Sequence, residues 1–265
     1  AAYERAIALD PDNWAAHNAI GHVYYRLDLP AESLAAYERA IAIDPHKEHP
    51  YYGLAILLAT KLGRFAEAHA VLARGLDAIP GSTWLADTIG TNHARSGQVE
   101  RALDVLEASM KADPGNAFAR GWVSMLLLQQ RRYADCIAVC VGDPAYAASQ
   151  DGQRTLGYAY MHLGQMAEAA PYLRQAVLLE PDDYEARGAL VAVCKAQGLI
   201  SDAAEHERIA RNQALRDDAY GQACYAAVTG DTAEAIAQLT TALKEFPPQR
   251  SWARLDPELT FVARD

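Results

Sequence analysis

The sequence predicts an all-α fold, a right-handed superhelical solenoid of antiparallel helix pairs. The main evidence is a repeat: the opening residues, AAYERAIALDPDN, return in nearly the same form from Ala35 as AAYERAIAIDPHK, 34 residues later. The second observation is composition, because alanine, leucine and glutamate are good helix formers. The third is that no alternating run of valine, isoleucine and threonine indicates a strand.

Residues 1–13 are predicted to form the second helix of a unit whose first helix is absent. Tyr3, Ala6, Ile7 and Leu9 would then lack the partner helix that their apolar face requires. Because a terminal repeat needs a polar outer face, we expect the chain to be a fragment of a longer polypeptide.

Residues 14–250 divide into about seven units, each with a helix, a tight turn and a second helix. The turn position is usually glycine, which permits the positive φ that often ends a helix; its occupants are Asp28, Gly63, Gly97, Arg131, Gly164, Gly198 and Gly230. Most second helices stop at a proline, which cannot continue a helix; these prolines are Pro11, Pro45, Pro80, Pro114, Pro181 and Pro247. The predicted units are 14–47, 49–82, 83–116, 117–149, 150–183, 184–215 and 216–249.

Small residues recur where the two helices of a unit face each other, so the helices can approach closely and a larger side chain would overpack the contact. Those in the first helices are Gly21, Gly90, Ser124, Gly157 and Ala223. Those in the second helices are Ser33, Ala102, Cys136, Ala169 and Ala235.

The fourth unit, 117–149, is degenerate. Gly142, Asp143 and Pro144 cut its second helix short, which predicts a bend near residues 141–149. Pro171 lies inside the second helix of the next unit, where it removes a backbone hydrogen bond and predicts a kink.

Residues 251–265 leave the 34-residue period. Asp256 followed by Pro257 is a typical helix start. Leu255, Leu259 and Val262 could then cover the last helix pair, so we expect a C-terminal capping helix.

The stretch TLGYAYMHLGQMAEAAPYLRQAVLLEPDD, from Thr155, follows a known pattern. It resembles the tetratricopeptide repeat, in which leucine-glycine, tyrosine, alanine and proline recur over 34 residues. The matching residues are Leu156, Gly157, Tyr160, Ala169, Ala176 and Pro181, and in the first unit Ile20, Gly21, Tyr24, Tyr37, Ala40 and Pro45. The resemblance implies a protein-interaction module whose first helices line a concave groove.

From this register we expect a set of first-helix side chains to contact a peptide or protein partner. They are Asn18, His22, Tyr25, Arg26, Lys61, Trp84, Thr91, Arg95, Met125, Arg154, Tyr158, His162, Lys195 and Tyr220. Arg26, Lys61 and Arg95 recur at one register and could receive an acidic segment. Equally, basic residues suit the end of any helix because of its dipole.

Gly53, Gly121 and Gly188 take an inward register in alternate units. Glycine inside a helix costs about 1 kcal/mol relative to alanine, so the missing side chain needs a reason. A ligand backbone lying close to the helix and tight packing between units both explain it.

Charge and composition exclude several functions. With a net charge of −10, the chain would repel phosphate backbones, so nucleic acid is not an expected partner. No apolar stretch is long enough to insert in a membrane. Cys136, Cys140, Cys194 and Cys224 are expected to fill small core positions, and a cytoplasmic location is consistent with free cysteines.

Chemistry-bearing motifs are missing from the sequence. His46 and His49 lie in a connection without a nearby third metal ligand. There is no phosphate-binding glycine loop and no nucleophile elbow. We therefore expect no catalytic residues, no metal and no cofactor in this chain.

The sequence thus predicts a scaffold that binds a peptide segment or a protein partner in its groove. An alternative is that the chain is the regulatory or sensor array of a larger bacterial enzyme, such as a signalling ATPase, a kinase or a glycosyltransferase. The N-terminal helix, exposed without its partner helix, could also allow self-association.

Overall fold

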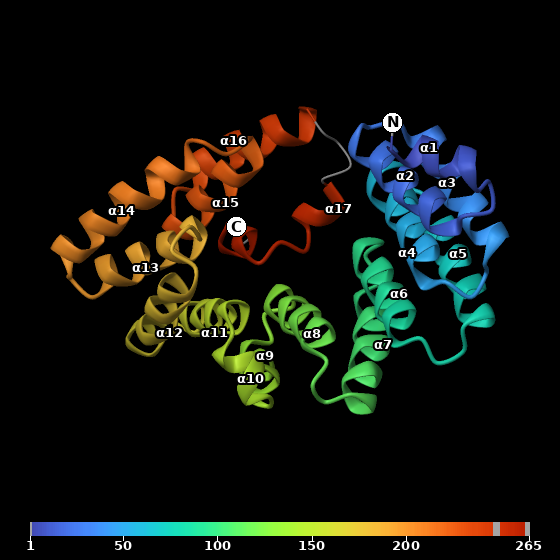
Figure 1. Cartoon of the computed structure of the whole chain (residues 1–265). Helices are drawn as coiled ribbons and strands as arrows, with labels where there is room; N and C mark the ends of the chain where they lie inside the picture. The colour runs from blue at the N-terminus through green and yellow to red at the C-terminus, as the bar shows by residue number, and fades with distance from the viewer. Residues whose placement is uncertain (1, 246–249, 263–265) are drawn as a thin grey trace. The chain divides into compact units, whose positions relative to one another are not determined.

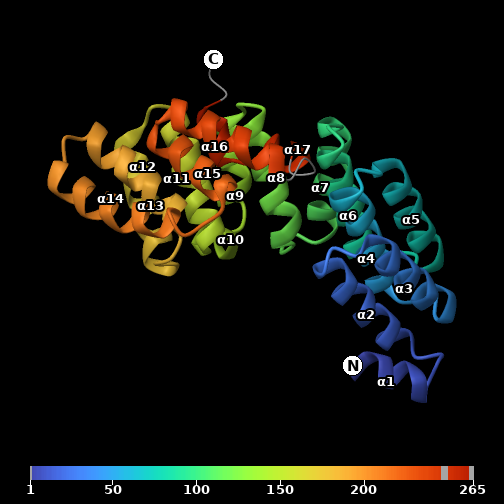
Figure 2. The same ribbon diagram turned by 90° about the horizontal axis from the view of Figure 1, so that it is seen from above.

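The computed structural model describes residues 2–245 and 250–262. These residues form helices and turns, and no strand occurs among them. The chain divides into two compact units, residues 1–109 and 110–265, and the division falls inside helix α7 (Val99–Ala112). We describe each unit by itself (Figures 1 and 2).

Unit 1 contains helix pairs that pack side by side. Its elements are α1 (Ala2–Leu9), α2 (Trp14–Arg26), α3 (Pro30–Ile43), α4 (Glu48–Ile56), the π-helix η1 (Leu57–Lys61), α5 (Phe65–Ala78), α6 (Thr83–Arg95) and the greater part of α7. Helix α2 packs on α3, and α4 packs on α5. The core includes Tyr37, Tyr51, Leu54, Leu72 and Leu85.

Unit 2 continues the same arrangement. Its elements are α8 (Ala117–Gln129), α9 (Tyr133–Val141), α10 (Pro144–Ala148), α11 (Gln150–His162), α12 (Met166–Leu179), α13 (Tyr184–Ala196), α14 (Ile200–Ala214), α15 (Ala219–Thr229), α16 (Thr232–Glu245), α17 (Arg250–Ala253) and the 3₁₀-helix η3 (Glu258–Phe261). The pairs α8–α9, α11–α12, α13–α14 and α15–α16 each pack together. Helices α8, α11, α13 and α15 are the first helices of their pairs.

Every predicted turn position has a positive φ. The five glycines there have φ between 65° and 87°, and Asp28 and Arg131, the two substitutes, have φ of 57° and 60°. The prediction that this position needs glycine-like geometry is confirmed, even where a side chain is present. Since left-handed geometry costs an ordinary residue about 1–2 kcal/mol, Asp28 and Arg131 are held in place by the helices on either side.

A polar side chain caps most first helices. Asn13, Ser82, Asn116, Ser149 and Asp183 each accept a hydrogen bond from the backbone N–H three residues ahead. This bond satisfies one of the free donors at a helix start. The caps explain why α2, α6, α8, α11 and α13 begin at the residues that the period predicts.

The small residues at the helix contacts are buried, as expected. A Cβ added to Gly157 would lie 2.5 Å from Leu173 Cδ2, and one added to Gly21 would lie 2.9 Å from the Tyr37 ring. Only a hydrogen atom fits at these positions. The second helix α12 runs through Pro171 from Met166 to Leu179 as one continuous helix.

The second unit of the repeat contains one extra residue. Asp28 and Gly63 are 35 residues apart, whereas Gly63 and Gly97 are 34 apart. The extra residue is taken up by the π-helix η1, where Leu62 N donates to Leu57 O. A π turn accommodates an insertion without disturbing the helix before it.

The fourth unit breaks where the sequence predicts. Helix α9 ends at Val141, and α10 begins at Pro144 with the Asp143 carboxylate as its cap. Arg120, which is 5% exposed, fills the gap: its guanidinium donates to Val139 O and to Pro114 O, each at 2.7 Å. Among the described residues, no helix is long and apolar enough to cross a membrane.

Candidate binding groove

The C-terminal segment of the chain lies on the first helices of unit 2. We define this segment as residues 252–262 and the surface beneath it, the inner groove, as Met125, Gln129, Arg154, Tyr158, His162 and Tyr220. Figure 1 shows the segment, in red, close to α8, α11 and α15, and the contacts below place it there.

The expected single capping helix over 251–265 does not form in the described residues 251–262. The segment instead ends α17 at Ala253, runs irregularly, and makes one short turn, η3. The reason is that its apolar side chains reach different helices: Leu259 packs on α15, and Phe261 stacks on His162 of α11. Residues 263–265 lie outside the described part.

Two tyrosines hold two acidic residues of the segment. Tyr158 Oη donates to Glu258 Oε1 at 3.1 Å, and Tyr220 Oη donates to Asp256 Oδ2 at 2.9 Å. The other oxygen of Asp256 accepts from Glu258 N at 3.1 Å and so fixes the turn. Both acidic residues are about 95% buried, so these bonds replace the water that the carboxyl groups lose.

An aromatic stack holds the end of the segment. The His162 ring lies between Phe261, at 4.1 Å between centroids, and Tyr133, at 4.9 Å. His162 Nε2 is also 2.9 Å from Thr260 Oγ1. At the other end, Trp252 meets Trp122 edge to face, with the ring centroids 5.9 Å apart.

One guanidinium faces several carboxyl groups beside the segment. Arg154 lies 3.1 Å from Asp183, 3.6 Å from Glu185 and 4.0 Å from Glu258. Burial opposes the charge of Arg154, but these neighbours, Glu258 foremost, outweigh it and raise its pKa. Burial and then the nearby Asp256 raise the pKa of Glu258 well above its ordinary value.

The segment does not fill the groove. A cavity of about 450 Å³ lies along one side, between the segment and residues of α8, α11 and α13 that include Trp122, Met125, Arg154 and Glu185. A second cavity of about 310 Å³ lies beside Gln129 and Tyr133. Gln129 Nε2 donates to Arg254 O at 2.7 Å, but its buried Oε1 has no partner.

The predicted residues of unit 1 are more dispersed. Tyr25 Oη lies 3.1 Å from Thr60 Oγ1, and Trp84 packs on His49 and Tyr52. Thr91 is 3% exposed and donates to Thr88 O. Asn18 is half-buried and His22 exposed on α2.

The three basic residues at one register do not form a uniform surface. Lys61 Nζ lies 2.9 Å from Asp28 Oδ1 and above the Tyr25 ring. Burial lowers the pKa of Arg95, which lines a small pocket near Thr91, and Arg26 is exposed in the last turn of α2. Their proposed role in receiving an acidic segment stays a prediction.

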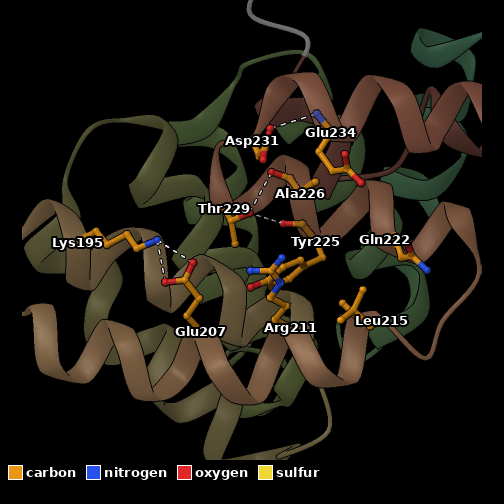
Figure 3. Close-up of a pocket in the computed structure, with 11 residues that line it drawn as sticks. Lys195, Glu207, Arg211, Leu215, Gln222, Tyr225, Ala226, Thr229, Asp231 and Glu234 are labelled. Atoms are coloured by element: carbon orange, nitrogen blue, oxygen red, sulfur yellow. Dashed lines mark hydrogen bonds and ion pairs between the residues drawn. The ribbon is translucent and has the colours of Figure 1, made fainter.

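Lys195 belongs to a different pocket, also of about 450 Å³, among α13, α14, α15 and α16 (Figure 3). Lys195 Nζ lies 3.0 Å from Glu207. The spacing between Gly198 and Gly230 is only 32 residues, and α15 starts at Ala219, not at the expected Arg216. Because Lys195 already pairs with Glu207 and no segment of the described chain lies on this pocket as one does on the inner groove, it is the weaker candidate.

The inward glycines have different neighbours. A Cβ on Gly53 would lie 2.5 Å from the Tyr37 ring, and one on Gly188 about 3.0 Å from Val228. Packing therefore accounts for both. Gly121 borders the larger groove cavity, and its nearest side-chain atom would be 3.5 Å away.

Several functional candidates were missed from the sequence. Tyr133 and Gln129 lie at the turn between α8 and α9, outside the register used to select groove residues. Within the segment, the acidic pair in LDPEL was a detectable signal. The four cysteines are free and buried, as predicted, and no group of metal-ligating side chains occurs within the described ranges.

Comparison with known families decides the identity of the repeat. Models described as tetratricopeptide or TPR repeats match residues 1–28, 15–47, 88–140 and 150–183, which together are about half of the chain. The chain is a tetratricopeptide-repeat protein. Comparison with curated protein sequences found no match.

Solved structures share the fold at low sequence identity. A chain of the APC/C hetero-tetramer Cut9–Hcn1 is 16% identical, with a TM-score of 0.65; the match covers 81% of this tetratricopeptide chain and 43% of that one. PilW, a type IV pilus biogenesis factor, is 20% identical with a TM-score of 0.57, over 68% and 83% of the two chains. A MamA RS-1 double mutant is 20% identical, TM-score 0.53, over 63% and 96%. These similarities show the fold alone.

Proposed function

We propose that this chain is a protein-interaction scaffold that binds an extended segment of a partner in the inner groove of unit 2. The observation that supports the proposal is the chain's own segment, which lies on Tyr158, His162 and Tyr220 through directional hydrogen bonds and ring stacking. A surface that holds one short segment by side-chain contacts can hold another of similar chemistry.

The proposal is tested by selecting displayed random peptides on the full chain and mapping the best binder by hydrogen exchange. Protection of α8, α11 and α15 is expected, and protection confined to α12, α14 and α16 would contradict the proposal. His162→Ala should weaken binding about 10-fold, since it removes a stack and a hydrogen bond. Tyr160→Phe is the matched control, because Tyr160 stacks on Tyr172 and not on the segment.

A further inference from the structure

The contacts of the segment define the ligand chemistry of the groove. Asp256 and Glu258 accept from Tyr220 of α15 and Tyr158 of α11, which are 62 residues apart in sequence. Because each phenol is held by its helix, the distance between them favours acidic side chains two residues apart. A leucine after the second acid enters the cluster with Ala223 and Ala227.

Residues 252–262 fill the groove less completely than a structural cap would. Solvent-open pockets of about 450 and 310 Å³ remain along its two sides, so a different ligand could make contacts there that the segment does not make. The buried Gln129 Oε1 accepts no hydrogen bond from the segment.

Burial of the acidic pair opposes docking as well. The Glu258 carboxyl loses its water and lies beside Asp256, and both effects disfavour its charge. Arg154 compensates in part, at 4.0 Å, while it also faces Asp183 and Glu185. This desolvation cost weakens docking of the internal segment, and a partner with the same acidic pair would bear it too, so the partner's advantage must come from contacts in the pockets that the segment leaves open.

We propose that residues 252–262 are an internal competitor for the groove, an inference that rests on the proposed function. A partner segment displaces them when it carries two acidic side chains two residues apart, flanked by leucines and followed by an aromatic residue. Tethering gives the internal segment an effective concentration of the order of mM. A partner on another chain therefore displaces the segment only if its tighter binding outweighs this high local concentration.

The test uses the labelled peptide WARLDPELTFV, which copies residues 252–262, as a probe for the full chain. We expect weak binding to the wild-type chain. A weakened-segment variant, Leu259→Ala with Phe261→Ala, should bind the probe at least about 10-fold more tightly, because its own segment competes less. The control Leu178→Ala with Ile236→Ala removes exposed apolar side chains elsewhere and should leave the wild-type affinity unchanged.

The ligand chemistry is tested in the weakened-segment variant. A probe with alanine in place of both acidic residues should bind about 10-fold more weakly or worse, since hydrogen bonds to the carboxyl groups are lost. Tyr158→Phe and Tyr220→Phe should each reduce the affinity for the acidic probe several-fold, whereas Tyr160→Phe should not.

Four results would overturn the inference. If the weakened-segment variant binds the probe no better than wild type, or no longer unfolds cooperatively in denaturant at 25 °C, the segment is a structural cap. A wild-type dimer that exchanges segments between copies would replace the internal competitor with a second copy. If acid-free library peptides bind the groove as tightly as the probe, the proposed function stands and the acidic preference fails.

Discussion

Glycine has two separate roles in these repeats, and single substitutions can distinguish them. Gly97 has a φ of 82°, and a Cβ there would meet nothing within 4 Å. Gly157 lies inside α11, where a Cβ would meet Leu173. The first position is determined by backbone geometry and the second by packing.

Gly97→Ala should lower the free energy of unfolding by about 1 kcal/mol, because alanine resists a positive φ. Gly157→Ala should lower it by about 1–3 kcal/mol through overpacking. Denaturant unfolding followed by circular dichroism measures both. In a double-mutant cycle, Leu173→Ala should relieve the Gly157→Ala defect and leave that of Gly97→Ala unchanged; equal coupling to both glycines would refute this distinction.

For single residues, the sequence predicted the position in the repeat better than it predicted which side chains touch. The register selected Tyr158, His162 and Tyr220, and each of these side chains contacts the C-terminal segment. It could not show that Tyr158 meets Glu258, 100 residues later, because a single sequence holds no information on which distant pairs touch. Arg120 was overlooked for the same reason: its two carbonyl partners lie 6 and 19 residues away, one in the turn before α8 and one in the last turn of α9.

The helices follow the 34-residue period. Where one residue is inserted, the π-helix η1 accommodates it. The spacing of 35 residues between Asp28 and Gly63 was visible in the sequence. What the spacing could not decide is whether the extra residue would lengthen a loop or widen a helical turn.

Deletion of Thr60 should convert η1 into an ordinary α-helical turn and preserve the fold, with loss of about 1–2 kcal/mol from its bonds to Ile56 O and Tyr25. Deletion of Ala94, at the same distance before the turn of α6, should unfold the unit because no extra residue exists there. Thermal melts of the two variants provide the measurement. If the Ala94 deletion is more stable than the Thr60 deletion, η1 does not contain an extra residue.

Arg120 replaces the missing part of helix α9. Its guanidinium satisfies Val139 O at the end of α9 and Pro114 O before α8. Lysine cannot donate to two carbonyls in the same fixed geometry, so Arg120→Lys should cost about 2 kcal/mol of stability. Arg101→Lys, on the exposed face of α7, should cost less than about 0.5 kcal/mol; similar losses in urea unfolding would argue against the role of Arg120.

The whole chain is acidic, and part of that acidity is buried in unit 2. Burial, and then Glu258, raise the pKa of Glu185 from 4.5 to about 8. Arg154, Asp183 and Asp217 also act on this group. Because the folded-state pKa lies above the unfolded one, Glu185 favours the folded state below pH 4.5, and this contribution is lost as the pH rises to about 8.

Glu185→Gln should therefore leave the thermal midpoint unchanged at pH 4 and raise it by about 3 °C at pH 9, equivalent to about 1 kcal/mol. Differential scanning calorimetry at both pH values is the measurement. Glu168→Gln, an exposed neutralisation on α12, controls for the change in net charge. An equal effect at pH 4 and pH 9 would rule out titration of Glu185.

The four cysteines, buried on three different helix pairs, provide a means of timing local motion. A thiol reagent can alkylate Cys136 and Cys140, Cys194, or Cys224 only after the corresponding pair opens. Mass spectrometry of a single alkylation time course would therefore rank the opening rates of neighbouring repeats, with no label introduced and no residue changed.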